Sequence, residues 1–316
     1  MLAHLTFPHD TYRLVMDARA LTPDCLIDVD PVRYRAELAA KEAILASDHR
    51  YYAQAPPETA AMQWEAITLL LPNMARYYPA HFALATAGDE WRWANRLLGT
   101  ETAFTLGDAT TLPLAPLDWL GRQVQEDLCL MDGALPGTPL VAGHLCFAGG
   151  WCLDDMRGRS FLGVHEAVPE FAARIGRSAD LAMQRLKAAR PIARVNWGVV
   201  GTDALDCSPR ATGGTNQWPE TLTVTNAGTH CFLRSEWQTL VRLPETRAVL
   251  FTIRTRVTPL ATARAHPADA RKIAALLRTM SPEIRAAKGL SDPILHPILA
   301  YLDAIVRDVR EESPDA

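Results

Sequence analysis

The sequence lacks long hydrophobic runs, a large excess of either charge and paired cysteines. Its longest apolar runs, such as ITLLLP, fall far short of the roughly 20 residues that a membrane helix needs. The 316 residues carry a formal net charge of −4 without a long basic block, which argues against nucleic-acid binding as the main activity. None of the six cysteines forms a CxxC pair, and the opening MLAHLTFPHDTYRLVM lacks the layout of a signal peptide. We therefore expect reduced thiols in a cytoplasmic protein with no nucleic-acid or membrane partner.

Several catalytic and nucleotide-binding signatures are also missing. No GxGxxG follows a predicted strand, and neither GxxxxGK[ST], HExxH nor GxSxG occurs. Dinucleotide-binding, P-loop, zincin and α/β-hydrolase interpretations therefore have no motif to support them. The most glycine-rich stretch, ATGGTNQW at 211–218, does not follow a strand and is interpreted as a surface loop rather than a phosphate cradle.

The first third of the chain has helical periodicity. Asp30 and Pro31 form a typical helix start. One face of the helix that follows is predicted to carry Tyr34, Leu38, Lys41 and Leu45. A second helix is predicted to bury Trp64, Ile67, Leu71, Met74 and Tyr78. Pro72 should kink or interrupt that helix. Residues 79–115 show no sustained period and are predicted to be irregular, with at most one strand.

The middle of the chain changes to β character. The stretches LVAGHLCF, ARVNWGVV, THCFLRSEWQTLVRL and AVLFTIRTRV are rich in β-branched and aromatic residues, and residues 244–247 suit a hairpin loop between the last two. In the first long strand of this hairpin, polar and apolar residues alternate. One face is predicted to carry Arg234, Glu236, Gln238 and Arg242, and the other Leu233, Trp237, Val241 and Leu243. A polar face of this kind can line a binding site.

The end of the chain returns to helix, with predicted apolar stripes of Ile273, Leu276, Leu277 and Met280, then Leu299, Leu302, Ile305 and Val309. We predict an α+β fold in one composite domain over residues 1–310. Its parts are a helical segment at 1–125, a β-rich core at 126–258 and a helical segment at 259–310, followed by a frayed tail at 311–316.

Two histidines are candidate ligands. His144, Cys146 and Cys152 lie close in sequence, but no second pair completes a four-ligand zinc set. His165 stands in FLGVHEAVPEF among apolar residues, and Pro169 prevents an ordinary helix from continuing there. A histidine in this setting is commonly a core or cap residue bonded to a carbonyl. An apolar wall with one neutral imidazole is also what haem needs on its proximal side.

Six blocks of sequence resemble one known family. VQEDLCLM, AGHLCFAGGW, VHEAVPEF, RVNWGVV, NAGTHCFLRSEWQTLVRLP and FTIRTRVTPL occur in the order and at roughly the spacing of the haem-dependent oxidative N-demethylase family. The resemblance extends from YRLVMDARAL to KGLSDPILHPILAYLD. It implies a haem-binding, PAS-like antiparallel sheet embedded in helices. It also implies O2-dependent removal of an N-methyl group from a small amine such as dimethylamine, with release of formaldehyde.

The resemblance further implies cofactors and partners. Haem b would be held by His165 as the proximal iron ligand, and electrons would come from NADPH through a separate flavin or iron–sulfur reductase. A haem-binding PAS-like sensor or carrier without turnover is the alternative, although no output module is evident in the sequence. A haem-free relative that keeps only the fold is a third possibility.

Candidate residues for the remaining roles lie in the matching blocks. Glu236 is the nominee to hold a cationic amine; the alternative is a salt bridge to Arg254 or Arg256 across the hairpin. Asn196 and Trp197 are candidates to line the pocket, although a strand tryptophan is commonly core. Arg234 and Arg254 suit haem propionates, and ordinary surface pairing is their alternative. Glu126 and Asp127 are expected to cap or bridge backbone, with catalysis as the minority interpretation.

Three departures from the family pattern affect the expected substrate. Ala148 and Gly149 replace a proline and a serine, Gly198 replaces a serine and Trp237 replaces an arginine. If these positions line the pocket, a bulkier or less polar amine is expected. Neutral packing changes are the alternative.

Overall fold

A seven-stranded antiparallel sheet forms the centre of the molecule. The computed structural model describes residues 9–188, 190–213 and 216–312. The strand order is β1-β8-β9-β10-β6-β7-β2, and every neighbouring pair is antiparallel. The strands are β1 (Arg19–Ala20), β2 (Ala53–Gln54), β6 (Asp127–Met131), β7 (Leu140–His144), β8 (Ile192–Val200), β9 (Phe232–Arg242) and β10 (Val249–Pro259). The expected mixture of helices and antiparallel sheet is confirmed.

The β9–β10 hairpin is the longest continuous pairing in the sheet. Its ladder runs without a register shift from Phe232–Pro259 to Arg242–Val249, and the Leu243 N–H donates to the Ala248 carbonyl at 2.7 Å. The predicted loop at 244–247 is therefore confirmed. Because side chains alternate along an unbroken strand, Glu236 lies on the face opposite Trp237, as the alternation of polar and apolar residues predicted.

The N-terminal helices are α1 (Tyr34–Tyr52), α2 (Ala60–Tyr77) and α3 (Pro116–Gly121). The predicted helix start at Asp30 and Pro31 is too early, because α1 has Arg33 at its N-cap. The Asp30 carboxylate instead accepts hydrogen bonds from the Val32 and Arg33 N–H groups of the preceding turn. The expectation that Pro72 interrupts the second helix is wrong, because α2 continues through it. Pro72 is exposed and Thr68 is only half-buried, so water can reach the Thr68 carbonyl that loses its helical partner.

Residues 79–115 contain more order than the sequence indicated. They form a three-stranded antiparallel sheet of β3 (Phe82–Ala87), β4 (Glu90–Asn95) and β5 (Thr100–Thr105). Gly88 and Gly99 have φ of 62° and 74° at the two turns, a region that glycine enters without steric cost. Because these glycines interrupt the sequence periodicity, the three strands could not be recognised from the sequence. The part of the chain expected to be helical up to residue 125 therefore includes a small sheet.

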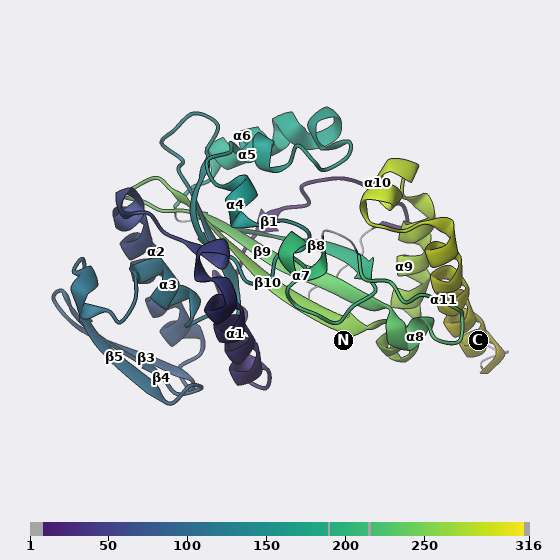
Figure 1. The fold of residues 1–316 in the computed structure, drawn as a ribbon, viewed down its shortest axis with the longest axis horizontal. Coiled ribbons are helices and arrows are strands. Elements are labelled where there is room, and N and C mark those ends of the chain that lie inside the picture. Colours follow the sequence, from purple (N-terminus) through teal and green to yellow (C-terminus); the bar gives the residue numbers. More distant parts are fainter. Residues whose placement is uncertain (1–8, 189, 214–215, 313–316) are drawn as a thin grey trace.

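Short helical turns connect the strands of the main sheet. They are α4 (Leu153–Met156), α5 (Phe161–Val164), a π-helical turn (Ala172–Gly176), α6 (Arg177–Arg185), α7 (Pro209–Thr212) and α8 (Ala227–His230). Three 3-10 turns complete the set, at Pro57–Thr59, Ala109–Thr111 and Leu260–Ala265. Figure 1 shows α4, α5 and α6 gathered above the sheet, between the N-terminal helices at one end and the C-terminal helices at the other.

The C-terminal helices are α9 (Pro267–Thr279), α10 (Pro282–Ala287) and α11 (Asp292–Glu312). The predicted apolar stripes are confirmed for the residues that are buried or half-buried there: Ile273, Leu276, Leu277, Met280, Leu299, Leu302 and Ile305. The side chain of Val309 and residues 313–316 lie outside the described part. Helix α11 continues through position 310, so residues 311 and 312 are helical rather than frayed.

Three apolar clusters leave part of one sheet face uncovered by hydrophobic packing. On the face opposite Glu236, β6 and β10 pack against α2 and α3, while Val199 and Leu233 pack against α9 and α11. On the Glu236 side, Cys129, Leu240 and Ile253 pack against α5, the π-helical turn and α6. The polar residues of β8 and β9 follow directly beyond this last cluster. We call these residues the Glu236 face: Arg194, Asn196, Gly198, Arg234, Glu236 and Gln238.

The first described residues form an extended strap beside this face. Tyr12, Leu14 and Met16 are half-buried, and the residues between them are exposed. Leu14 and Met16 pack on the cluster under α5 and α6, whereas Tyr12 packs on the C-terminal cluster and donates its N–H to the Thr279 hydroxyl at 2.8 Å. The strap therefore connects the two helical layers that border the Glu236 face (Figure 1).

Candidate functional site

His165 is held with one ring nitrogen engaged and the other free. It follows α5, whose Ser160 caps the helix by accepting a hydrogen bond from the Gly163 N–H at 3.1 Å. The His165 Nδ1 lies 2.8 Å from the Phe161 carbonyl oxygen. A carbonyl can only accept, so Nδ1 carries the proton and Nε2 keeps its lone pair. Within the described residues Nε2 has no hydrogen-bond partner.

Two phenylalanines fix the orientation of the ring. The rings of His165 and Phe171 stack with centroids 4.4 Å apart and an angle of 14° between planes, and the ring of Phe161 lies 4.7 Å away. The chain reverses between them, with Glu170 at φ 63°, as Pro169 predicted for a segment that cannot continue as helix. Burial and the nearby Arg194 cation lower the pKa of His165. The imidazole is therefore neutral at pH 7, the form that binds metals.

Glu236 is the centre of the polar face. Its Oε2 accepts hydrogen bonds from the Asn196 amide at 3.2 Å and the Gln238 amide at 2.9 Å. Its Oε1 accepts no hydrogen bond in the described chain and lies 3.7 Å from the Arg234 Nε. The alternative interpretation, a salt bridge across the hairpin, is wrong: Thr255 pairs with Glu236, so its neighbours Arg254 and Arg256 point to the other face. One carboxylate oxygen, Oε1, thus remains able to accept a hydrogen bond from a ligand.

Three cations surround this carboxylate. Arg234 is buried and donates to the Phe147 carbonyl at 2.5 Å and the Leu205 carbonyl at 3.0 Å. Lys288, just after α10, donates to the Trp197 carbonyl at 3.0 Å, and Glu236 counteracts the lowering of its pKa by burial. Arg194 sits directly opposite Gln238 and makes no hydrogen bond or ion pair within the part of the chain described. With a neutral His165, the positive charges outnumber Glu236.

Two glycines leave room next to these groups. A Cβ on Gly149 would lie 3.1 Å from the Glu236 Oε1 and 3.3 Å from the Arg234 Nε, and a Cβ on Gly198 would lie 3.6 Å from the Lys288 Nζ. Gly149 is exposed and lies next to the free oxygen of Glu236. Two of the three departures from the family pattern, at Gly149 and Gly198, therefore adjoin the Glu236 face. Trp237 does not, since it lies on the opposite face with the Arg19 guanidinium 5.5 Å above its ring.

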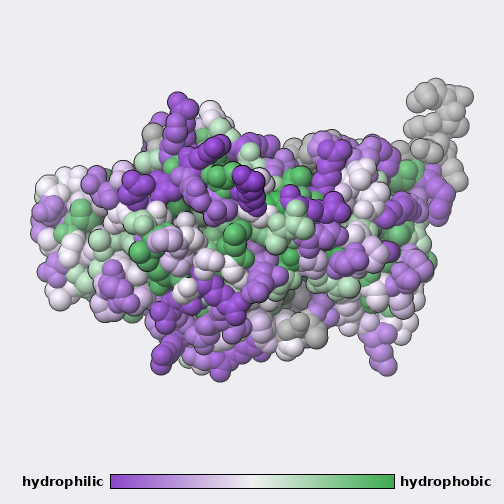
Figure 2. Space-filling model, turned by 90° about the horizontal axis from the view of Figure 1, so that it is seen from above, coloured by the Kyte–Doolittle hydropathy of each residue, from purple (hydrophilic) through white to green (hydrophobic). Residues whose placement is uncertain are grey.

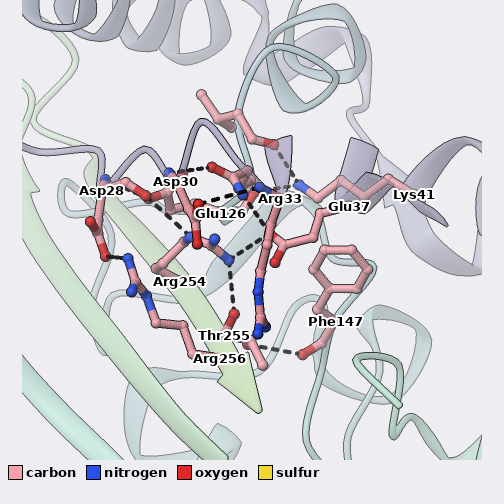
Figure 3. Close-up of polar contacts among 12 residues, drawn as sticks. Asp28, Asp30, Arg33, Glu37, Lys41, Glu126, Phe147, Arg254, Thr255 and Arg256 are labelled. Atoms are coloured by element: carbon pink, nitrogen blue, oxygen red, sulfur yellow. Dashed lines mark hydrogen bonds and ion pairs between the residues drawn. The ribbon is translucent and has the colours of Figure 1, made fainter. Parts of the chain in front are cut away.

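Arg254 and Trp197 are not brought to this site. Trp197 lies on the opposite face and packs against the C-terminal cluster. Arg254 is fully buried on that face, where its Nη1 is 2.8 Å from the Glu37 Oε2 and its Nε donates to the Asp28 carbonyl (Figure 3). The expected role of Arg254 with propionates is therefore not supported. Arg194 takes its place as the available guanidinium, and its position two residues before Asn196 on one strand was the sequence signal for it.

Arg254 belongs to a buried charge cluster between α1 and the sheet. Its other ionic members are Glu37, Lys41 and Glu126 (Figure 3), together with Asp127. All four are buried. Lys41 donates to the carbonyls of Gly121, Val124 and Glu126. The expected capping roles are confirmed, because Glu126 accepts from the Asp28 N–H and Asp127 accepts from two N–H groups of the 146–147 loop. Burial raises the pKa of Glu126 to about 7 and that of Asp127 to about 6.

The second histidine candidate lies inside the protein. His144 is fully buried at the end of β7, and a Cβ on Gly121 would fall only 2.3 Å from its ring. Its Nδ1 is 3.9 Å from the Cys146 Sγ, but Cys152 instead donates to Asp155. Across the described residues, no three histidine, cysteine or acidic side chains are grouped closely enough to hold a metal ion. A zinc site at His144 and Cys146 is therefore not supported, and this histidine has no open side for a large cofactor.

The site residues are compatible with a haem group. His165 offers a neutral, oriented Nε2 next to an apolar wall, which matches a proximal ligand. On the adjoining Glu236 face, the Arg194 Nε, the Arg234 Nε and the Gln238 Oε1 are buried atoms without hydrogen-bond partners in the described chain. Buried polar atoms are normally satisfied, so three orphans on one face indicate that water or a ligand completes it. The excess of positive charge on this face, from Arg194, Arg234 and Lys288, suits the carboxylates of a porphyrin.

The chain is a mixed helix and antiparallel-sheet protein that carries a polar surface on β8 and β9 near the His165 imidazole. The chain matches the family described as haem-dependent oxidative N-demethylase, alpha subunit-like, over residues 17–293. It therefore belongs to that family, and the family description indicates haem dependence and an oxidative demethylase subunit.

Among the described residues no helix is both long and apolar enough to cross a membrane, and the surface seen from above is largely hydrophilic (Figure 2).

Proposed function

We propose that this protein is the haem-binding catalytic subunit of an oxidative N-demethylase that acts on a small N-methylated amine. The observation that carries the proposal is the His165 imidazole, fixed through Nδ1 with a free Nε2 beside a polar face that holds a carboxylate. The antiparallel strands β8, β9, β10, β6 and β7, with helices packed on both faces, support a PAS-like sheet as the frame for haem b.

His165 would hold the iron through Nε2, and Arg194 and Lys288 are the cations available to the haem periphery. When bound, haem would supply, with O2 and two electrons, the oxidation of the N-methyl group that ends in formaldehyde and the shorter amine. The apolar residues around His165 would limit water access on the proximal side. The Phe161 carbonyl would hold the imidazole in one tautomer, since outer-shell acceptors fix the orientation of ligating histidines.

Glu236 is proposed to bind the amine through Oε1. Its other oxygen is held by the Asn196 and Gln238 amides, so the carboxylate is pre-oriented and loses little freedom on binding. An ammonium or amine N–H would donate to Oε1, which faces the space next to Gly149. Asn196 is thus proposed as a positioning residue, because its described contact is with Glu236 rather than with the open space.

Electrons are proposed to reach the site from NADPH through a separate flavin or iron–sulfur reductase, since the sequence carries no nucleotide or iron–sulfur motif. The isolated chain, loaded with haem and given NADPH and O2, should not turn over an amine. Addition of a reductase or a chemical reductant should be required before formaldehyde appears. Rapid NADPH-driven turnover by the chain alone would contradict this part of the proposal.

The first experiment is the absorption spectrum of the full-length chain with haem b. We expect the intense bands of a histidine-ligated haem in wild type, their loss in His165→Ala, and their retention in the control His230→Ala, which removes an exposed histidine on α8. An unchanged spectrum in His165→Ala would overturn the ligand assignment. No haem uptake by wild type would identify a haem-free relative, and haem uptake without formaldehyde from any amine would favour a sensor or carrier.

The second experiment measures amine-induced shifts of the haem spectrum for secondary and tertiary methylamines. Glu236→Gln should weaken amine binding by roughly tenfold or more, because a charge-assisted hydrogen bond is lost, which corresponds to about 1.4 kcal/mol. Haem affinity should stay near that of wild type. If Glu236→Gln binds every amine as tightly as wild type, Glu236 is structural.

A further inference from the structure

Two cationic side chains beside Glu236 form no ion pair within the described residues, although Glu236 acts on both at longer range and favours their charged forms. Arg194 makes no hydrogen bond or ion pair within the described residues, and its Nε is a buried atom without an acceptor. Among the residues that the structure describes, the ammonium of Lys288 donates only to the Trp197 carbonyl, a neutral group. Two fully buried cations elsewhere in the described chain have more partners: Lys41 donates to several carbonyls, and Arg254 pairs with a carboxylate.

The positions of these two cations define a short row. On β8, Arg194, Asn196 and Gly198 point to the same face and lie opposite Gln238, Glu236 and Arg234 in turn. Arg194 extends from one end of this row. Lys288 approaches the other end, where its Nζ would lie 3.6 Å from a Cβ on Gly198. The cations therefore flank the Asn196–Glu236 pair, and Gly198 presents no side chain to the Lys288 ammonium.

The charge balance of the face favours an anion. Arg194, Arg234 and Lys288 contribute three positive charges and Glu236 one negative charge, which leaves two positive charges. The strap carboxylate Asp17 also acts on Arg194, but it is exposed and forms no ion pair with it in the described chain. Burial lowers the pKa of both Arg194 and Lys288, so the protein environment alone disfavours their charged forms. A bound anion would reverse that penalty.

We propose that Arg194 and Lys288 form a carboxylate-binding pair on either side of Glu236. This inference rests on the proposed function and extends it. The carboxylate has two possible sources: a haem propionate, or a substrate that carries a carboxylate as well as its methylated amine. In the second case the substrate is a zwitterionic N-methyl amino acid, with its nitrogen at the Glu236 Oε1 and its carboxylate at the cations.

The two sources are separated by two binding measurements on the full-length, haem-loaded chain. The first is the rate of transfer of haem b, and of haem dimethyl ester, to apomyoglobin. The second is the dissociation constant of N-methylglycine and of dimethylamine, measured from the shift of the haem spectrum. The variants are Arg194→Gln, Lys288→Gln and the conservative Arg194→Lys. Arg92→Gln is the matched control, since Arg92 is exposed on β4 in the separate small sheet.

If the carboxylate is a propionate, Arg194→Gln and Lys288→Gln should speed the loss of haem b by roughly tenfold and leave the loss of the dimethyl ester unchanged. If it belongs to the substrate, the same variants should weaken N-methylglycine by roughly tenfold, equivalent to about 1.4 kcal/mol, and leave dimethylamine unchanged. Arg194→Lys should restore part of either effect. If the rate of haem loss and the dissociation constant of N-methylglycine in Arg194→Gln and Lys288→Gln both stay within twofold of those in Arg92→Gln, the carboxylate pair is overturned.

The proposed function can fail separately. If wild type takes up no haem, calorimetric titration of the chain with N-methylglycine and with acetate still tests the pair. Heat of binding that disappears in Arg194→Gln and Lys288→Gln, but persists in Arg92→Gln, would support a carboxylate site without a haem. Absence of any binding in wild type would overturn it.

Discussion

The sheet carries charged residues on both faces, and the two groups are built differently. In the buried charge cluster, Arg254 is fully buried and lies 2.8 Å from the Glu37 carboxylate. On the Glu236 face, the shortest ion pair is 3.7 Å, from Arg234 to Glu236, and Arg194 has no partner in the described chain. Glycines adjoin the Glu236 face, whereas α1 covers the buried cluster.

The difference separates charges that stabilise the fold from charges that await a ligand. Complete burial is tolerated only when an ion is paired and hydrogen-bonded, and the buried cluster largely meets that condition. The Glu236 face does not meet it, because Arg194 has no hydrogen bond or ion pair in the described chain and Lys288 donates to one neutral carbonyl. The same residue type, arginine, thus has a structural role at Arg254 and a proposed binding role at Arg194, and burial with pairing distinguishes the two.

The largest expected effect comes from breaking the buried pair. Arg254→Met should lower the free energy of unfolding by about 3–5 kcal/mol, because the Glu37 carboxylate is left buried without its cation. The matched variant Arg194→Met should cost less than about 1 kcal/mol, since no partner is orphaned. Urea denaturation of both variants measures the contrast. Equal losses would show that the two arginines are not energetically different.

The double variant Arg254→Met with Glu37→Leu sharpens this test. Replacing a whole buried ion pair by apolar residues is often close to neutral, so the double variant should recover much of the stability that Arg254→Met loses. If the losses of the single variants simply add, the destabilisation comes from packing and the ion pair contributes little.

The fold was predictable where a residue's role depended on local pattern. The hairpin at 232–259, the polar alternation around Glu236 and the C-terminal stripes follow from period and turn chemistry, and the structure confirms them. The meander at 82–105 was missed because Gly88 and Gly99 interrupt three short strands whose pairing depends on neighbours rather than on each strand's own sequence.

The candidate site was predictable only in part, for a related reason. Asn196, Arg234 and Glu236 lie on strands whose alternation could be counted, and they fall on one face. The prediction that Arg254 binds a propionate failed because the register of the hairpin decides which face each arginine takes, and the sequence does not show that register. Lys288 could not be found at all, since it lies just after α10, 52 positions after Glu236 in the chain.

The next effect concerns pH and the buried carboxyl of Glu126. Burial raises its pKa from 4.5 to about 7, so the folded state holds a proton that the unfolded state has released. The unfolded chain therefore binds fewer protons between about pH 4.5 and 7, and stability contributed by this group falls as pH rises through that window. The total loss is about 3 kcal/mol if the whole shift is expressed.

Glu126→Gln should remove this pH dependence. Glutamine keeps an oxygen to accept from the Asp28 N–H but does not titrate. The melting temperature of the variant should gain on wild type between pH 4.5 and 7 and then stay parallel above pH 7. Asp28→Asn is a control that changes an acidic group in the same neighbourhood while leaving Glu126 in place. A constant difference between Glu126→Gln and wild type across this window would contradict the assignment.

The smallest expected effect tests whether the open side of the Glu236 face is a binding surface. Gly149→Ala places a methyl group 3.1 Å from the Glu236 Oε1, which covers the oxygen proposed to bind the amine. Gly149 has a φ that other residues adopt, so stability should change by less than about 1 kcal/mol. Amine affinity should fall roughly threefold to tenfold, most for tertiary methylamines, whose third substituent needs the same space.

Gly198→Ala provides the matched comparison on the neighbouring strand. Its methyl group would lie 3.6 Å from the Lys288 Nζ, an ordinary contact distance, and it does not approach Glu236. Amine affinity should therefore stay within about twofold of wild type. Spectral titration of both variants with dimethylamine and trimethylamine measures the pair. If Gly149→Ala and Gly198→Ala behave alike, Oε1 is not the contact, and the amine nitrogen is held elsewhere than on the carboxylate that these two glycines adjoin.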